Sequence, residues 1–230
     1  MSHPLFDQFL ADADEAARAV VDRLADRAVT VHASRNGLLY EQGDANDGIH
    51  LVAHGAVVLE WQRPNGSPLG FRLALAGDNF GARSFCAGQP HAATARAVRE
   101  TMVLRIPATV LTSVLRELPA LWRTLARVVA RDAGPQLAKV LRDPRTPARL
   151  RLAYLLAYLD ERLAGWVTPV VGHPDSPLRQ RDVAHLLDVT DETVSRSVTA
   201  LARDGLVRAG ADGLRVPDAA ALRAAFDTDR

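Results

Sequence analysis

Short apolar runs alternate with turn-forming residues between residues 29 and 107, and this texture constrains the fold more than any other feature. The runs occupy 38–40, 49–52, 56–61, 71–75 and 102–106. Pairs such as Asn36-Gly37 and Gly77-Asp78 separate them. Many short strands at regular spacing between turn signals predict an all-β sandwich or barrel.

The rest of the chain has a helical pattern. Apolar residues recur at the helical period over 12–27, 108–117, 148–163, 179–187 and 191–204. A longer helix begins at Pro119, and Gly134-Pro135 should kink or interrupt it. Its apolar seam packs either on the chain's own β domain or on the same helix of a second copy. The pattern leaves both alternatives open for the seam residues, which are Leu121, Leu125, Val128 and Val129.

Residues 180–198 carry the strongest functional signal. Two short helices flank a turn at 188–190, Thr190 is placed to cap the second helix, and Gly205 is placed to end it. Short strands at 206–208 and 214–216 then predict a hairpin. This order is typical of a winged helix-turn-helix, and the alternative is an ordinary helical hairpin with a solvated face. The small core is expected to consist of Val183, Leu186, Leu187, Val194 and Val198.

The polar face of the second helix suits the edges of base pairs. Arginine pairs with guanine, glutamate with the amino group of cytosine, and serine with several acceptors and donors. The net charge of +1 does not indicate the basic surface that many DNA-binding domains have. The prediction of DNA binding therefore rests on this motif. The predicted DNA-contacting residues are Arg179, Thr190, Asp191, Glu192, Thr193, Ser195, Arg196 and Thr199.

At these residues the chain resembles the CRP/FNR regulators. Residues 192–196 keep the Glu-Thr-Val-Ser-Arg pattern of the recognition helix, with the serine typical of the FNR/FixK-type branch. Residues 40–57 are similar to the turn-and-strand series of the sensor domain, and Gly77-Asp78-Asn79-Phe80-Gly81 is similar to its "GDxFG" motif. The resemblance covers nearly the whole chain.

The resemblance implies an α+β fold in three parts. These are a jelly-roll sensor of the cyclic-nucleotide-binding type over 1–118, a dimerisation helix and hinge over 119–145, and a winged helix-turn-helix over 146–230. The resemblance thereby makes the seam of the long helix the expected dimer contact, with Leu121, Leu125, Val128 and Val129 as the dimerisation residues. It also implies a cytoplasmic homodimeric transcription regulator, with double-stranded DNA and RNA polymerase as partners.

The implied target is an inverted repeat like TTGA(T/C)-N4-(G/A)TCAA. Arg196 would contact the guanine, Glu192 the cytosine of the same pair, and Ser195 a thymine. Asp191 stands where cyclic-AMP regulators have arginine, which disfavours their TGTGA preference.

Departures from the family pattern bear on the effector. Cyclic-AMP binders use a glutamate for the ribose and Arg-Ser for the phosphate, and the matching positions here are Ala82, His91 and Ala92. A buried phosphate without its guanidinium is costly, so cyclic AMP is disfavoured. An unidentified small effector, or control by abundance, remains open. The resemblance places the effector pocket at Gly81, Ala82, Arg83, Ser84, His91, Ala92 and Thr94.

A few individual residues limit which cofactors the sequence predicts. Cys86 is the only cysteine, so neither a disulfide within the chain nor a cysteine-held iron–sulfur cluster is expected. It is a redox switch or, more simply, a packing residue. Arg83 would clamp an anionic effector or pair with an acidic neighbour. Haem remains an open alternative through one of His32, His50, His54 and His91.

The sequence shows no features of a membrane or secreted protein. No stretch approaches ~18 apolar residues, and residues 1–10 lack the layout of a secretory signal, so we expect a cytoplasmic protein without membrane contact. Two alternative classes are a cupin-like metal enzyme, which would need clustered His and Glu ligands, and a ligand-binding module that no longer binds DNA. We expect no catalytic residue and no metal site.

Overall fold

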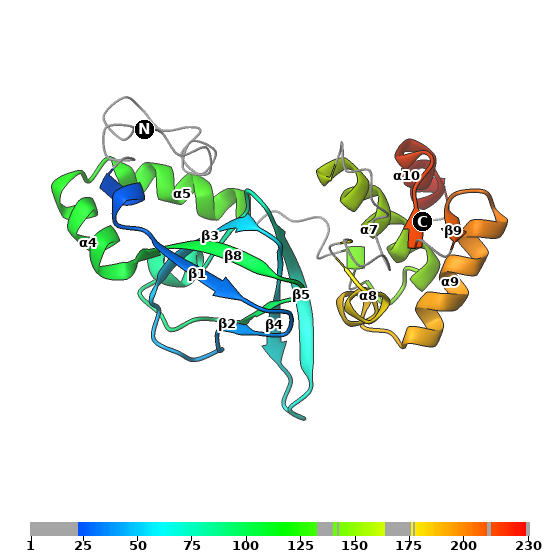
Figure 1. The fold of residues 1–230 in the computed structure, drawn as a ribbon, viewed down its shortest axis with the longest axis horizontal. Helices are drawn as coiled ribbons and strands as arrows, with labels where there is room; N and C mark the ends of the chain where they lie inside the picture. The colour runs from blue at the N-terminus through cyan, green and yellow to red at the C-terminus, as the bar shows by residue number, and fades with distance from the viewer. Residues whose placement is uncertain are drawn as a thin grey trace. The chain divides into compact units, whose positions relative to one another are not determined.

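The structure is a computed structural model that describes residues 23–132, 140–141, 143–163, 176, 178–210 and 213–228. Two compact units are formed, the first from 23–68 and 73–132, and the second from 69–72 and the described residues after 139 (Figure 1). No helix in these ranges is long and apolar enough to cross a membrane. Most of the helix expected over 12–27 and the kink expected at Gly134-Pro135 lie outside the described residues.

Two four-stranded sheets form the first unit, as the alternating texture predicts. Their strand orders are β1-β8-β3-β6 and β2-β7-β4-β5. The strands are β1 (Val29–Ala33), β2 (Leu38–Tyr40), β3 (Gly48–His54), β4 (Ala56–Gln62), β5 (Pro68–Leu75), β6 (Asn79–Phe80), β7 (Thr94–Ala97) and β8 (Thr101–Pro107).

Helices cover the sheet that contains β3 and β8. Antiparallel pairing places Ile49 opposite Ile106 and Leu51 opposite Leu104. These side chains enter one core with α3 (Ala82–Cys86), α4 (Ala108–Glu117) and α5 (Leu121–Asp132). Pro107 ends β8 and is the residue before α4, where a fixed φ and a missing N–H cost little.

The inner face of α5 is buried by its own unit. Leu121, Leu125 and Val128 are 1%, 0% and 1% exposed and belong to the core under β3 and β8. The alternative in which these three residues form a dimer contact is therefore wrong, because their side chains already pack on the sheet. Val129 is half-buried at the edge of the same core.

The second unit is helical with a small hairpin. Its elements are α7 (Ala148–Arg162), α8 (Gln180–Leu187), α9 (Asp191–Arg203), β9 (Arg208–Gly210), β10 (Gly213–Arg215) and α10 (Ala219–Thr228). The hairpin strands are shifted from the expected 206–208 and 214–216. Leu206 still closes the end of α9, its N–H bonding to the carbonyl of Leu201, so β9 begins later.

Candidate functional site

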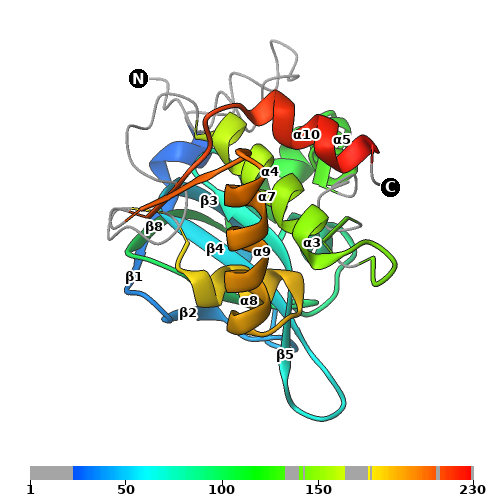
Figure 2. The ribbon, with the colours of Figure 1, turned by 90° about the vertical axis from the view of Figure 1, so that its right-hand side faces the viewer.

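α8, the turn and α9 form a helix-turn-helix in the second unit (Figure 2). Asp188 adopts the left-handed conformation at the end of α8, with φ 53°. The Thr190 hydroxyl accepts a hydrogen bond from the Thr193 N–H at 3.2 Å, so the predicted cap is present. Gly205 has φ 75°, as expected for the residue that stops α9. The small core is buried at Val183, Leu186, Leu187 and Val194, and Val198 is half-buried.

One face of α9 is left to solvent. The exposed residues of α9 recur at helical spacing and are Asp191, Glu192, Ser195, Arg196, Thr199 and Arg203. The first five are residues expected to contact DNA. Thr193 differs, because it is half-buried and its hydroxyl lies 3.0 Å from that of Thr190. Thr193 and Thr190 therefore support the helix start.

Arg196 is held loosely by its own helix. A guanidinium nitrogen lies 3.9 Å from a carboxylate oxygen of Glu192, and another lies 3.4 Å from the Thr193 hydroxyl. The Arg196 and Glu192 side chains are 70% and 78% exposed. An exposed pair of this kind contributes little to stability, so both side chains are free to bind elsewhere.

The start of α8 is tied to the start of α9. Gln180 donates from its side-chain amide to the Asp191 carbonyl at 3.0 Å. Arg179 is exposed, and its backbone N–H donates to Asp182 at 2.8 Å. This leaves the Arg179 side chain at the surface beside the recognition helix, where the sequence had placed a DNA contact.

Arg151 of α7 stabilises the packing of the helix pair. One of its terminal nitrogens donates to the carbonyls of Leu141 and Leu187, at 2.8 and 2.7 Å. It thereby joins the end of α8 to the chain segment before α7. The sequence reasoning missed this residue, because its role depends on carbonyls ten and 36 positions away.

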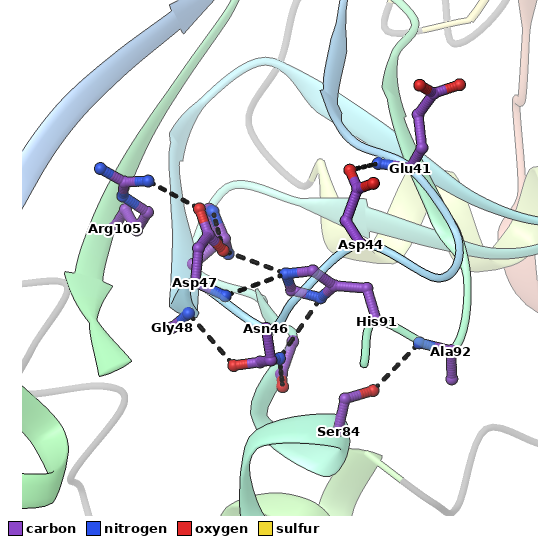
Figure 3. Close-up of polar contacts among 11 residues, drawn as sticks. Glu41, Asp44, Asn46, Asp47, Gly48, Ser84, His91, Ala92 and Arg105 are labelled. Atoms are coloured by element: carbon purple, nitrogen blue, oxygen red, sulfur yellow. Dashed lines mark hydrogen bonds and ion pairs between the residues drawn. The ribbon is translucent and has the colours of Figure 1, made fainter. Parts of the chain in front are cut away.

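A polar network around the buried His91 lies in the first unit, where the resemblance places the effector pocket (Figure 3). The His91 side chain is 1% exposed, with one ring nitrogen 3.0 Å from Asp47 and the other 3.3 Å from Asn46. Asp47 also binds Arg105 at 2.7 Å. The ring of His91 stacks on Tyr40 with 3.5 Å between centroids.

Close backbone packing holds this network together. Gly81 has φ 84°, and a Cβ there would lie 2.7 Å from the Gly48 carbonyl oxygen and 3.6 Å from the His91 ring. Asn46 donates to the carbonyl of Gly81 at 3.3 Å. The glycine that ends the "GDxFG" motif is therefore required by both its φ and its surroundings.

Charges in the network are mutually paired. Burial alone would raise the pKa of Asp47, but hydrogen bonds from His91 and Arg105 and nearby positive charge outweigh it, and the pKa is lowered. Burial lowers the pKa of His50 to about 4, against partial opposition from Asp47. Asp47 is therefore an anion at neutral pH, and His50 is neutral.

The expected effector residues do not all come together. Gly81, Ser84, His91 and Ala92 are linked, since the Ser84 hydroxyl accepts from the Ala92 N–H at 3.1 Å. Thr94 instead accepts from the Gln42 N–H. Arg83 is exposed, and within the described residues no acidic partner is found for it. Ala82 is buried in the apolar core.

A groove of about 610 Å³ lies beside the network. α3, the 88–90 loop, α4 and the first turn of α5 form its walls, and Ser84 is the one expected effector residue that lines it. Phe85, Leu115, Arg116 and Trp122 also line it. The sequence reasoning missed these four, because no local pattern indicates that α3, α4 and α5 meet.

His50 makes stability depend on pH. We expect the free energy of unfolding to fall by about 3 kcal/mol as the pH drops from about 6.5 to about 4. In this window the unfolded chain binds a proton at His50 while the folded chain does not. Urea denaturation of the wild type and His50→Gln at several pH values measures it. The variant should show a flatter slope, and equal slopes would contradict the assignment.

Comparison with known proteins gives matches to both units. Residues 30–117 match the cyclic nucleotide-binding domain, and residues 150–225 match the Crp-like helix-turn-helix domain. The cyclic AMP receptor protein of Thermus thermophilus is 30% identical over 184 residues, which cover 80% of this chain and 82% of the relative. The nitrogen fixation regulation protein FixK of Rhizobium meliloti is 33% identical over 170 residues, covering 74% and 73%.

Solved structures agree on the fold. FixK2 from Bradyrhizobium japonicum superposes with a TM-score of 0.72 at 24% identity, covering 86% of this chain and 96% of that one.

Proposed function

Since the chain belongs to the CRP/FNR family of transcription regulators, we propose that it is a homodimer that reads an inverted repeat like TTGA(T/C)-N4-(G/A)TCAA. The observation that carries this proposal is the exposed face of α9, where Glu192, Ser195 and Arg196 stand free on a capped helix. Arg196 would bind the guanine, Glu192 the cytosine of that pair, and Ser195 a thymine.

Supporting contacts would go to the DNA backbone. Arg179 is exposed at the start of α8, and Arg208 and Arg215 lie opposite each other in the hairpin, both exposed. Arginines in these places suit phosphates, which position a protein without reading sequence. The hairpin tip, residues 211–212, lies outside the described residues.

We assign one role to each of the three parts expected from the sequence. Residues 1–118 would sense, 119–145 would dimerise, and 146–230 would bind DNA. Bound at a promoter in the cytoplasm, the dimer would act on RNA polymerase. Selection from random duplexes tests the proposal directly. It should enrich the inverted repeat, whereas a non-palindromic motif would contradict it.

The outer face of α5 supports a dimer. Trp122 is 45% exposed, Ala126 and Ala130 are exposed, and Val129 is half-buried. Trp122, Ala126 and Ala130 follow each other by four residues, and Val129 lies three residues after Ala126, so they form a second apolar seam beside the buried one. Two copies related by a twofold axis would pair along it. Of the four dimerisation residues expected from sequence, only Val129 lies near it.

Cyclic AMP is not the proposed effector. Ala82 has no polar group for a ribose, and His91 is already bound to Asn46 and Asp47 and stacked on Tyr40. A phosphate at His91 would compete with the Asp47 carboxylate, which is paired with both His91 and Arg105.

Titration calorimetry with cyclic AMP should therefore give no binding heat at micromolar concentrations. Binding of the selected duplex by the same preparation serves as the control for folded protein. Micromolar affinity for cyclic AMP would overturn this view of the sensor domain.

Haem does not fit the histidines of the described residues. His50 and His91 are buried in the network, and His32 and His54 are exposed. None of these four histidines lines the groove of about 610 Å³. Burial raises the pKa of the Cys86 thiol, which disfavours the reactive thiolate and agrees with a packing role.

The described residues give no support to a cupin-like metal enzyme or to a ligand-binding module that no longer binds DNA. Among the described residues, no group of three or more His, Cys, Asp or Glu side chains is placed to hold a metal ion. The face of α9 retains the residues that DNA reading needs. An unidentified small effector is therefore the remaining question about the sensor domain.

A further inference from the structure

The groove beside α3 combines an apolar wall with one exposed charge. Its apolar part includes Phe85, Leu115 and Trp122, and the Trp122 residue is 45% exposed. A large aromatic side chain left open beside a concave surface offers a face on which a planar ring can stack.

Arg116 supplies the charge. It lies in the last turn of α4, is exposed, and is the one charged residue among those that line the groove. Within the described residues it has no hydrogen-bond or ion-pair partner. The adjacent Glu117 is engaged with Arg23 at 2.7 Å, so the nearest acid on the helix is already paired.

Two polar residues that line the groove also contact the network around His91. Asn46 lines the groove and binds both His91 and the Gly81 carbonyl, and Ser84 lines it and binds the Ala92 N–H. Figure 3 shows the Asn46 side chain bonded to His91 and the Ser84 side chain bonded to Ala92. A ligand in the groove would therefore touch two residues whose other contacts are inside the sensor domain.

We propose that this groove is the effector site and that it binds a small aromatic carboxylate. The ring stacks on Trp122 between Phe85 and Leu115, and the carboxylate binds the Arg116 guanidinium, which matches it in charge and in planar geometry. The inference deepens the proposed function by naming the ligand class of the sensor. Because Trp122 also belongs to the outer seam of α5, the bound ligand lies at the edge of the proposed dimer contact.

A charged probe and its neutral analogue test the site. Naphthalene-2-carboxylate and naphthalene-2-carboxamide share a ring system, and only the first carries a charge. Titration calorimetry on the full chain should show the carboxylate binding about tenfold or more tightly than the amide. Equal affinities, or no binding of the carboxylate at millimolar concentration, would overturn the proposal.

Two arginine variants locate the site. Arg116→Gln should remove the preference for the carboxylate and change amide binding less than about twofold. Arg83→Gln is the matched control, because Arg83 is exposed and unpaired within the described residues but does not line the groove. Loss of carboxylate binding in Arg83→Gln, with Arg116→Gln unaffected, would place the site elsewhere and refute the groove.

Duplex binding on the same preparations separates the two proposals. Carboxylate binding without selection of an inverted repeat would remove the DNA-reading function and leave the groove intact. Selection of the repeat without carboxylate binding would do the reverse.

Discussion

Replacing Arg196 with alanine should lower the affinity for the selected inverted repeat by about 30-fold to about 10⁴-fold. A bidentate contact to guanine discriminates by about 1–3 kcal/mol, and a dimer loses one contact in each half-site, about 2–6 kcal/mol together. Weak, salt-sensitive binding to any duplex should remain, because phosphate contacts are untouched. Fluorescence anisotropy with cognate and scrambled duplexes at two salt concentrations measures both effects.

The Arg196→Ala substitution should change DNA binding without changing the fold. Arg196 is 70% exposed and makes only long contacts with Glu192 and Thr193, so its removal should not unfold α9. Arg203→Ala is the matched control, since Arg203 lies in the same helix and is 80% exposed. If Arg196→Ala still selects the same G·C pair, the proposed orientation of the recognition helix is wrong.

Ala126→Glu should convert the dimer to monomers without unfolding it. Ala126 is exposed on the outer seam of α5, so glutamate is tolerated by the isolated unit, but two copies would bring like charges together at an apolar contact. Light scattering should report half the mass, with unchanged circular dichroism. A dimer that persists would place the interface elsewhere.

Leu125→Asp, one position earlier, should instead destabilise the sensor domain. Leu125 is fully buried in the core, and an unpaired carboxylate there costs several kcal/mol beyond the lost packing. Ala224→Glu, the same substitution at an exposed position of α10, is the control for Ala126→Glu and should leave the dimer intact.

The network around His91 shows where local sequence pattern is insufficient. Aligned motifs pointed to Ala82, His91 and Ala92, and His91 is indeed at the centre of a network. Asp47 belongs to none of the motifs that indicate the effector pocket, although its carboxylate binds both His91 and Arg105. The three residues lie on separate segments, and only the folded sheet brings them together.

The β texture, the helix pair, its cap and its exposed face were determined by the sequence alone, because each depends on residues within a few positions. Turn glycines, the Thr190 cap and the spacing of Ser195 and Arg196 are local properties of the chain. Which face of α5 is buried was decided by tertiary structure, since Leu121 and Trp122 are both apolar and only the sheet beneath the helix chooses between them. The groove likewise exists only because α3, α4 and α5 converge, leaving Arg116 without a partner within the described residues beside an open tryptophan.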